Sequence, residues 1–356
     1  MINIFYNNKP YGIKNLDLLA EEAPFFKPAI SFIKNWMTNT EKFDFQSSGS
    51  TGVPKMLDIS RKQILSSVEL TRKYLQLKQG EKALVCLSPE YIATKMMIAR
   101  CLVLGLDIVL VEPCANPLDR VNISTKIDFA SFVPMQVQKI LDSVHSARLS
   151  KIRNVLIGGA GVHNSLINKL KNFNNKIYHT YGMTETVSHV ALRKLDKNSQ
   201  TNHFTCLSEV HIRTDENDCL VVSGPMTDHK EIFTKDLIEI HNQNEFTWKG
   251  RLDNLVNSGG VKIIPELVEE QLISIFRRSN LSNEFFLAGI EDPLLGQKLV
   301  LLIEGGHTDK TLDSLNENMR KFLPKYHIPK EVIFKKEFIR TASGKVRRME
   351  TLKSIE

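Results

Sequence analysis

The sequence contains few cysteines and has no long uninterrupted apolar run. Its five cysteines are scattered along 356 residues without a Cys-x-x-Cys pair. This predicts neither a disulfide framework nor a zinc site, so we expect five reduced thiols. The most apolar stretch, residues 96–111, is interrupted by Arg100 and Asp107, which argues against a membrane span. The first nine residues do not resemble a secretory signal, so we expect a cytoplasmic protein.

The excess of positive charge does not by itself indicate a nucleic-acid partner. The formal net charge is +7 at pH 7 and the pI is about 9.0. However, the basic residues are spread along the chain, and no helix-turn-helix, finger or aromatic-basic motif accompanies them. Anionic small molecules such as ATP and CoA explain the charge balance equally well. We therefore expect small-molecule partners and neither nucleic acid nor membrane; the oligomeric state is left open.

The order of the apolar segments predicts two unequal domains. Short β-branched runs alternate with helical patterns over residues 82–178, which is typical of an α/β domain with largely parallel strands. From Glu209 onward, strand-like segments separated by turn residues predict a β-rich subdomain that closes this domain. A small α+β unit begins near Asp253 and is long enough to form a lid. We therefore expect domains at residues 1–250 and 254–356.

A polar segment at residues 47–55 has the composition of a phosphate-binding loop. Backbone N–H groups and hydroxyls can be directed at phosphate oxygens there, because glycine permits φ > 0 and close approach. It is not a Walker A loop, since Lys55 follows Pro54 and precedes Met56. A flexible polar turn is the alternative if the segment stands alone. The candidate phosphate-binding residues are Ser47, Ser48, Gly49, Ser50, Thr51, Gly52 and Lys55.

Further motifs follow this loop in an order that carries a family resemblance. They are Gly-Gly-Ala at 158–160, Tyr-Gly-Met-Thr-Glu-Thr at 181–186, Gly-Arg-Leu-Asp at 250–253, Ser-Gly-Gly at 258–260 and Thr-Ala-Ser-Gly-Lys at 341–345. In order and approximate spacing they resemble the adenylate-forming superfamily of acyl-CoA ligases, adenylation domains and luciferases. The resemblance implies that superfamily's fold, shortened at the N-terminus because only 46 residues precede the phosphate loop.

The resemblance assigns a nucleotide-binding role to residues in several of these motifs. Gly159 and Ala160 would lie beside the adenine, and Tyr181, followed by Gly182, would pack on it. Thr184 would bind the α-phosphate, while Glu185 would help to hold Mg²⁺, which suits a metal that prefers few carboxylates plus phosphate oxygens. The two residues aligned with the ribose-binding positions are Asp236 and Arg251. Each of these two could instead be half of a surface ion pair.

The remaining motifs imply a reaction in two steps, with ATP and CoA as co-substrates. A carboxylic acid would first become an acyl-adenylate, and the acyl group would then pass to the thiol of CoA. Lys345 would be the catalytic lysine of the first step. Asp253 would be the hinge about which the small domain turns before the second step. Gly259 and Gly260 would let the pantetheine arm pass close to the backbone.

The acid substrate must be inferred from residues between the shared motifs. Arg100 lies in an otherwise apolar predicted helix, where a guanidinium requires a carboxylate or carbonyl partner. This helix and the run at 183–193 resemble the o-succinylbenzoate-CoA ligases of menaquinone biosynthesis. Arg100, and with less support Ser188, would then bind the aryl carboxylate. The alternatives are a salt bridge from Arg100 to a neighbouring Asp or Glu, and satisfied polar roles for Ser188 and His189.

Three other functions remain compatible with the same motifs. The enzyme could be a different aryl- or acyl-CoA ligase, or a stand-alone enzyme that loads a carrier protein. It could also be a catalytically silent nucleotide-binding module. Retention of the candidate catalytic and nucleotide residues disfavours the silent module, and no carrier-protein motif is evident in the chain.

Overall fold

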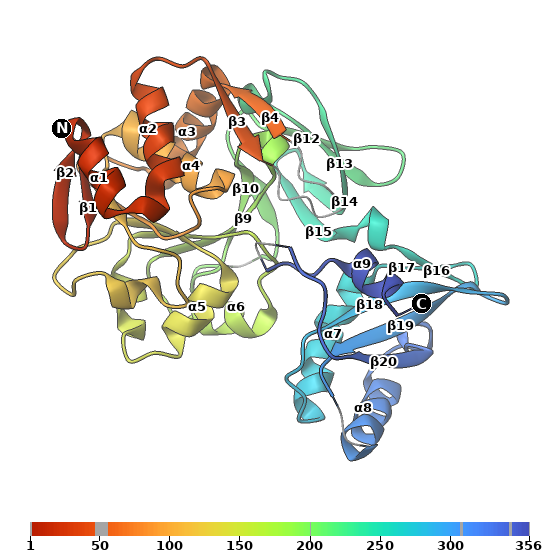
Figure 1. The fold of residues 1–356 in the computed structure, drawn as a ribbon. Helices are drawn as coiled ribbons and strands as arrows, with labels where there is room; N and C mark the ends of the chain where they lie inside the picture. Colours follow the sequence, from red (N-terminus) through yellow and green to blue (C-terminus); the bar gives the residue numbers. More distant parts are fainter. Residues whose placement is uncertain (1, 47–55, 200, 307–308, 342–343, 356) are drawn as a thin grey trace.

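One long mixed sheet forms the centre of the large unit (Figure 1). The computed structural model describes residues 2–46, 56–199, 201–306, 309–341 and 344–355. Within these residues, thirteen strands join in the order β12 (His211–Thr214), β13 (Cys219–Ser223), β14 (Ile232–Asn242), β15 (Glu245–Arg251), β11 (Phe204–Cys206), β10 (His189–Lys194), β9 (Lys176–Gly182), β8 (Asn154–Ile157), β7 (Phe129–Phe132), β5 (Lys82–Val85), β6 (Asp107–Leu110), β1 (Asn3–Tyr6) and β2 (Lys9–Gly12).

The strands from β9 to β1 are parallel and have helices on both faces. Successive residues of β5 contribute to cores on opposite faces of the sheet, because side chains alternate along a strand. Ala83 and Val85 belong to one core cluster and Leu84 belongs to the other. Covering both faces explains the continuous apolar runs in these strands. One face is covered by α2 (Lys27–Met37), α3 (Arg61–Leu75) and α4 (Ile92–Leu104), and the other by α5 (Pro134–Leu141) and α6 (Asn164–Leu170). The predicted α/β domain with parallel strands is confirmed.

The predicted β-rich region is present, but its strands continue the large sheet. The antiparallel pairing of β9 with β10 connects the parallel strands to β11 and β15, and through them to β12, β13 and β14. A separate pair, β3 (Lys42–Gln46) and β4 (Met56–Ser60), flanks residues 47–55. Strand partners can be far apart in the sequence, so local patterns did not predict this continuity.

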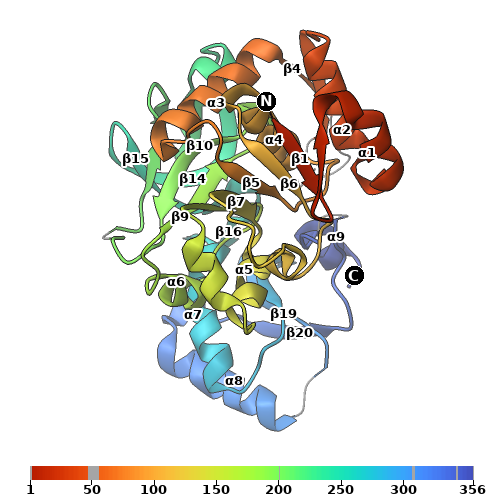
Figure 2. The same cartoon turned by 90° about the vertical axis from the view of Figure 1, so that its left-hand side faces the viewer.

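The small unit is a five-stranded sheet with its own core. Its strands are β16 (Val256–Ser258), β17 (Val261–Ile263), β18 (Phe285–Asp292), β19 (Gly296–Glu304) and β20 (Glu331–Lys335). Its helices are α7 (Pro265–Arg278), α8 (Asp309–Phe322) and α9 (Arg348–Lys353). Leu272 and Leu301 are among the buried residues of one cluster, while Phe286 and Phe338 belong to a second. Figure 2 shows this unit below the large sheet from a second direction.

Local apolar patterns predict a helix from Pro134 to Val144 and strands at residues 176–178 and 237–240, and one boundary or more of each element is wrong. The helix predicted from Pro134 to Val144 ends at Leu141, because the apolar face does not continue and Val144 is 93% exposed. The strand predicted at 176–178 extends to Gly182, because its last residues pair with β10. The strand predicted at 237–240 likewise spans the whole of β14, most of which pairs with β13 or β15.

Two further expectations concern the chain as a whole. All five cysteines are free, which confirms the expected absence of a disulfide framework. Within the described parts of the chain, no helix is both long enough and apolar enough to cross a membrane.

Candidate active site

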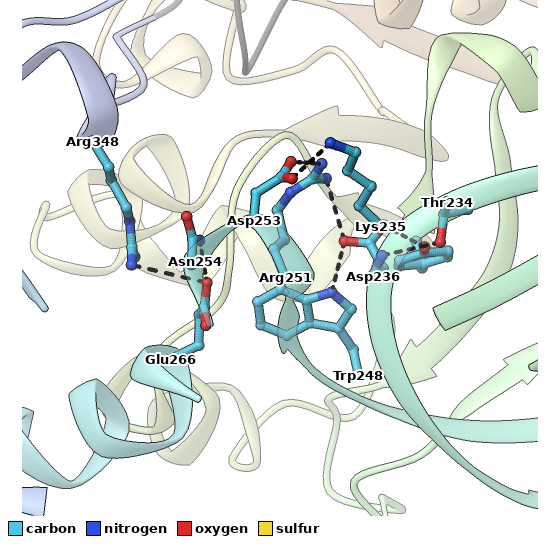
Figure 3. A network of polar contacts seen from close by, with 10 residues as sticks. Thr234, Lys235, Asp236, Trp248, Arg251, Asp253, Asn254, Glu266 and Arg348 are labelled. Atoms are coloured by element: carbon cyan, nitrogen blue, oxygen red, sulfur yellow. Dashed lines mark hydrogen bonds and ion pairs between the residues drawn. The ribbon is translucent and has the colours of Figure 1, made fainter. Parts of the chain in front are cut away.

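The Asp236 carboxylate, on β14, receives hydrogen bonds from side chains on two other strands of the large sheet, β9 and β15 (Figure 3). The Tyr181 hydroxyl donates to Oδ2 at 2.7 Å, and the Trp248 indole N–H donates to Oδ1 at 3.1 Å. The Arg251 guanidinium lies 3.4 Å from the same Oδ1, because Asp236 and Arg251 are paired across β14 and β15. Both carboxylate oxygens therefore already have protein donors, and any ribose hydroxyls would join or replace these contacts.

Tyr181 is held by aromatic packing as well as by this hydrogen bond. Its ring meets Phe204 and Phe246 edge-on, with centroid distances of 5.8 and 5.3 Å. Burial and the nearby Asp236 carboxylate raise the pKa of Tyr181 well above its usual value. The phenol therefore stays protonated and donates its hydrogen to Asp236.

The turn after β9 requires glycine at position 182. A Cβ on Gly182 would lie 2.2 Å from the Ser188 carbonyl oxygen and 2.5 Å from the His189 Cα. This close approach brings the 181–186 motif against the start of β10. Thr184 is buried and Glu185 is exposed on the short 3-10 turn at Thr184–Thr186.

The Glu185 carboxylate fits a limited role at a magnesium ion. It is an oxygen ligand, and its exposure leaves it accessible to a bound nucleotide. Over the described part of the chain, no group of three His, Cys, Asp or Glu side chains could hold a metal by itself. Mg²⁺ would therefore arrive with ATP and be coordinated mainly by phosphate oxygens and water.

His179 and Arg193, which the sequence did not single out, hold the loop that contains Gly159 and Ala160. One His179 ring nitrogen, Nε2, lies 3.2 Å from the Ala160 carbonyl oxygen, and the other lies 3.2 Å from the Arg193 guanidinium. Burial and the charge of Arg193 lower the pKa of His179 to about 3. His179 is therefore neutral; it accepts from Arg193 and donates to Ala160. Gly159 has φ of 83°, which explains the glycine there.

Arg100 is a buried cation that forms no ion pair with the described residues. Its side chain lies on α4, is 2% exposed, and donates from Nη2 to the Ser188 hydroxyl at 2.8 Å. Its Nε has no hydrogen-bond partner, and no ion pair joins it to an Asp or Glu of the described chain. Burial lowers its pKa to about 10. The alternative of an internal salt bridge is therefore not found there, and Arg100 and Ser188 lie together as predicted.

Lys345 lies in the C-terminal segment, near enough to Arg251 for the two charges to interact. Its turn is closed by a hydrogen bond from the Thr341 N–H to the Lys345 carbonyl oxygen at 2.8 Å. Burial, and then the positive charge of Arg251, lower the pKa of Lys345. Figure 1 shows the dark-blue segment around this turn extending from the small unit toward the large sheet. Lys345, Arg251, Asp236 and Tyr181 thus form one group.

Two predicted features cannot be placed in this group. The phosphate-loop candidates Ser47, Ser48, Gly49, Ser50, Thr51, Gly52 and Lys55 lie outside the described residues. Gly259 and Gly260 form the two-residue turn between β16 and β17, with φ of 62° and 83°. A turn with two positive φ values favours glycine at both positions, so local conformation alone explains this pair.

The link between the two units contains several polar contacts (Figure 3). Asp253 lies in the 3-10 turn Leu252–Asn254 and pairs with Lys235 at 2.7 Å. Asn254 donates to a carboxylate oxygen of Glu266 at the start of α7. A Cβ on Gly250 would lie 2.5 Å from Glu266 Oε2, so the small unit packs closely on the end of β15.

The chain matches known proteins over most of its length. A crystal structure of an acyl-CoA synthetase (AMP-forming)/AMP-acid ligase II-like protein from Dyadobacter fermentans is 36% identical, with a TM-score of 0.63; the match covers 97% of this chain and 99% of that one. A 2-succinylbenzoate–CoA ligase from Haemophilus influenzae is 26% identical over 335 residues, which cover 90% of this chain and 68% of the relative.

A structure with lower sequence identity has the same fold. The O-succinylbenzoate Coenzyme A Synthetase from Bacillus subtilis, in complex with ATP and magnesium ion, has a TM-score of 0.75 at 18% identity; the match covers 98% of this chain and 83% of that one. The family model described as AMP-binding enzyme matches residues 46–225, which is half of the chain. Together with the 36% identical relative, this match shows that the chain belongs to the AMP-binding enzyme family.

Proposed function

We propose that this protein is a cytoplasmic, AMP-forming ligase that converts o-succinylbenzoate to o-succinylbenzoyl-CoA. The observation that carries the choice of acid is Arg100, a buried cation beside Ser188 whose Nε has no partner among the residues that the structure describes. Such a group lacks the anion that would offset its desolvation, and a substrate carboxylate supplies that anion. The 26% identical ligase from Haemophilus influenzae, which is named for this acid, supports the proposal.

In the proposed first step, the succinyl carboxylate attacks the α-phosphorus of ATP. A P–O bond to the acid forms, the P–O bond to the β-phosphate breaks, and pyrophosphate leaves. The step brings anions together, so positioning and charge neutralisation carry most of the catalysis. An ammonium about 4 Å from a phosphate oxygen contributes on the order of 4 kcal/mol at an effective dielectric of 20. We assign that contribution to Lys345.

Other residues would bind the nucleotide during this step. Residues 47–55 would cradle the triphosphate of the MgATP substrate, with Thr184 at the α-phosphate and Glu185 at the metal. Tyr181 and the loop held by His179 would enclose the adenine, because both lie at the carboxyl ends of neighbouring strands. The ribose hydroxyls would bind at Asp236 and Arg251.

In the proposed second step, the CoA thiolate attacks the acyl carbon and AMP leaves. Lys345 must first withdraw, since it stands on the nucleotide side where the thiol has to enter. We propose that residues 254–356 turn as a lid about Asp253 relative to residues 1–250. Loss of the Lys235–Asp253 contact would accompany that turn. Gly259 and Gly260 would then line the path of the pantetheine arm.

A pyrophosphate-release screen tests the proposal. The purified chain is incubated with ATP, Mg²⁺ and each of o-succinylbenzoate, benzoates and fatty acids, and the products are identified by mass with and without CoA. We expect pyrophosphate release and an acyl-CoA mass with o-succinylbenzoate. If that acid were inert while others reacted, the assigned substrate would be wrong. Adenylate without thioester would indicate a carrier-protein acceptor, and nucleotide binding without pyrophosphate release would indicate a silent module.

A further inference from the structure

A series of polar groups linked by hydrogen bonds extends from Arg100 to the Ser67 carbonyl group on α3. Arg100 donates to the Ser188 hydroxyl, which lies 3.5 Å from His189 Nδ1. On the other side of the ring, His189 Nε2 lies 3.1 Å from the Thr71 hydroxyl on α3. Thr71 Oγ1 in turn donates to the Ser67 carbonyl oxygen at 3.0 Å. Arg100, His189 and Thr71 are each more than nine-tenths buried.

The donor and the acceptor of each hydrogen bond in this series can be assigned by starting from Thr71, which is farthest from Arg100. Thr71 has a single hydroxyl hydrogen, and that hydrogen is donated to Ser67, so the Thr71 oxygen must accept from His189. His189 therefore carries its proton on Nε2. Nδ1 is then a bare acceptor directed at Ser188. The Ser188 hydroxyl oxygen accepts a hydrogen bond from Arg100. Its single hydroxyl hydrogen therefore points either at His189 Nδ1 or at a ligand.

The charge state of His189 agrees with this assignment. Burial, and then the positive charge of Arg100, lower the pKa of His189 well below its usual value. With His189 neutral and protonated on Nε2, Arg100 is the charged group in this series of hydrogen bonds. Towards a ligand this series of hydrogen bonds then presents the remaining Arg100 N–H groups, which suit an anionic oxygen. The single Ser188 hydrogen reaches a ligand only when it is not donated to His189.

Ser188 is also fixed by an unusual backbone turn. The Ser188 N–H donates to the Thr186 carbonyl oxygen at 2.7 Å, and Val187 between them has φ of 64° and ψ of −42°. This is the rare γ-turn, which a β-branched residue adopts only with backbone strain. Buried contacts on both sides of Ser188 are therefore needed to keep its hydroxyl in place.

We propose that Thr71 and His189 are positioning residues, which hold Ser188 and Arg100 in the orientation that recognises the carboxylate remote from the reacting one. This inference rests on the proposed function, because it assigns specificity within the same acid site. Neither residue touches the acid in this scheme. Thr71 fixes the tautomer of His189, and His189 restrains the Ser188 hydroxyl.

Thr71→Val tests the inference by removing the acceptor while keeping the shape of the side chain. We expect KM for o-succinylbenzoate to rise about tenfold, as for the loss of one buried hydrogen bond. KM for ATP should not change, and kcat should stay within about twofold. Thr71→Ser retains the hydroxyl and should restore KM. Ser66→Ala removes a different hydroxyl from the same helix and should leave all three constants as in the wild type.

A second acid distinguishes positioning from general damage. The analogue 4-oxo-4-phenylbutanoate has the reacting succinyl arm but lacks the aryl carboxylate. The preference of the wild type for o-succinylbenzoate over this analogue should fall about tenfold in Thr71→Val. An unchanged preference, or equal loss of affinity for acid and ATP, would overturn the inference.

Nitrogen NMR of the wild-type imidazoles gives a readout that does not depend on activity. We expect His189 to be protonated on Nε2 alone and to remain neutral at pH values well below the usual histidine range, because burial and the charge of Arg100 lower its pKa. Protonation on Nδ1 would overturn the inference even if Thr71→Val failed to fold. If no acid reacted with the wild type, the proposed substrate would fail, whereas this tautomer would still be expected.

Discussion

The Lys345 ammonium lies close enough to the Arg251 guanidinium for the arginine charge to lower its pKa. The two residues come from different units, since Arg251 ends β15 of the large sheet and Lys345 lies in the C-terminal segment. The charges of Lys345 and Arg251 repel each other, although the Asp236 and Asp253 carboxylates lie 3.4 and 3.5 Å from Arg251, and an anion bound near Lys345 would offset this repulsion. The pair therefore favours binding of the ATP phosphates and of the carboxylate that attacks them.

This pair predicts a pH dependence of the first step. Only the protonated ammonium offsets anionic charge, so activity is lost as the pH rises through the pKa of Lys345. Burial and Arg251 lower that pKa from the ordinary 10.5, so the alkaline limb of kcat/KM should lie below 10.5. Arg251→Gln removes one cause and should move the limb to higher pH, whatever it does to KM. Pyrophosphate release measured from pH 7 to 11 checks this, and a limb that stays in place or moves down would contradict it.

We expect Arg100 to lower the free energy of unfolding and to be required for turnover of the acid. A buried charge without a counter-ion carries a desolvation cost that an apolar side chain of similar size does not. We therefore expect Arg100→Met to raise the free energy of unfolding in denaturant while it abolishes turnover of o-succinylbenzoate. Arg320→Met, an exposed arginine on α8, should change neither property. A destabilised Arg100→Met with full activity would show that the cation has another role.

Gly182 should not tolerate even a methyl group. Its Cβ would overlap the Ser188 carbonyl oxygen, which is backbone and cannot rotate away. We expect Gly182→Ala to lose about 1–3 kcal/mol of stability and to raise KM for both acid and ATP. Gly12→Ala, whose Cβ would meet no atom within 4 Å, is the matched control for denaturant unfolding. Equal stability of the two variants would contradict the close approach of β9 and β10.

We expect Trp248 to contribute to the binding of ATP and not to the binding of the acid. Trp248→Phe removes the indole N–H that donates to Asp236 and leaves most of the ring in place. Loss of one such bond to a charged group should raise KM for ATP by about tenfold. KM for o-succinylbenzoate serves as the internal control in the same assays. A larger change in the acid constant than in the ATP constant would show that Asp236 does not serve the ribose.

Sequence patterns predicted the fold class, and they failed where contacts are distant in the chain. Strands such as β5 are continuous apolar runs, and Arg100 is conspicuous because the rest of its helix is apolar. Nothing near Thr71 or Trp248 in the sequence indicates that they contact His189 and Asp236, which are 118 and 12 residues away. The glycine pair at 259–260 was assigned to CoA, although its positive φ values alone explain it.

The central claim is that Lys345 serves the first step and must leave before the second. Lys345→Ala measured in the two half-reactions tests it most directly, with Lys353→Ala, an exposed lysine on α9, as control. We predict that Lys345→Ala loses pyrophosphate release from ATP and acid by more than about a hundredfold. Supplied with acyl-adenylate and CoA, the same variant should still form acyl-CoA at the wild-type rate. Equal loss of both half-reactions, or of neither, would contradict the account.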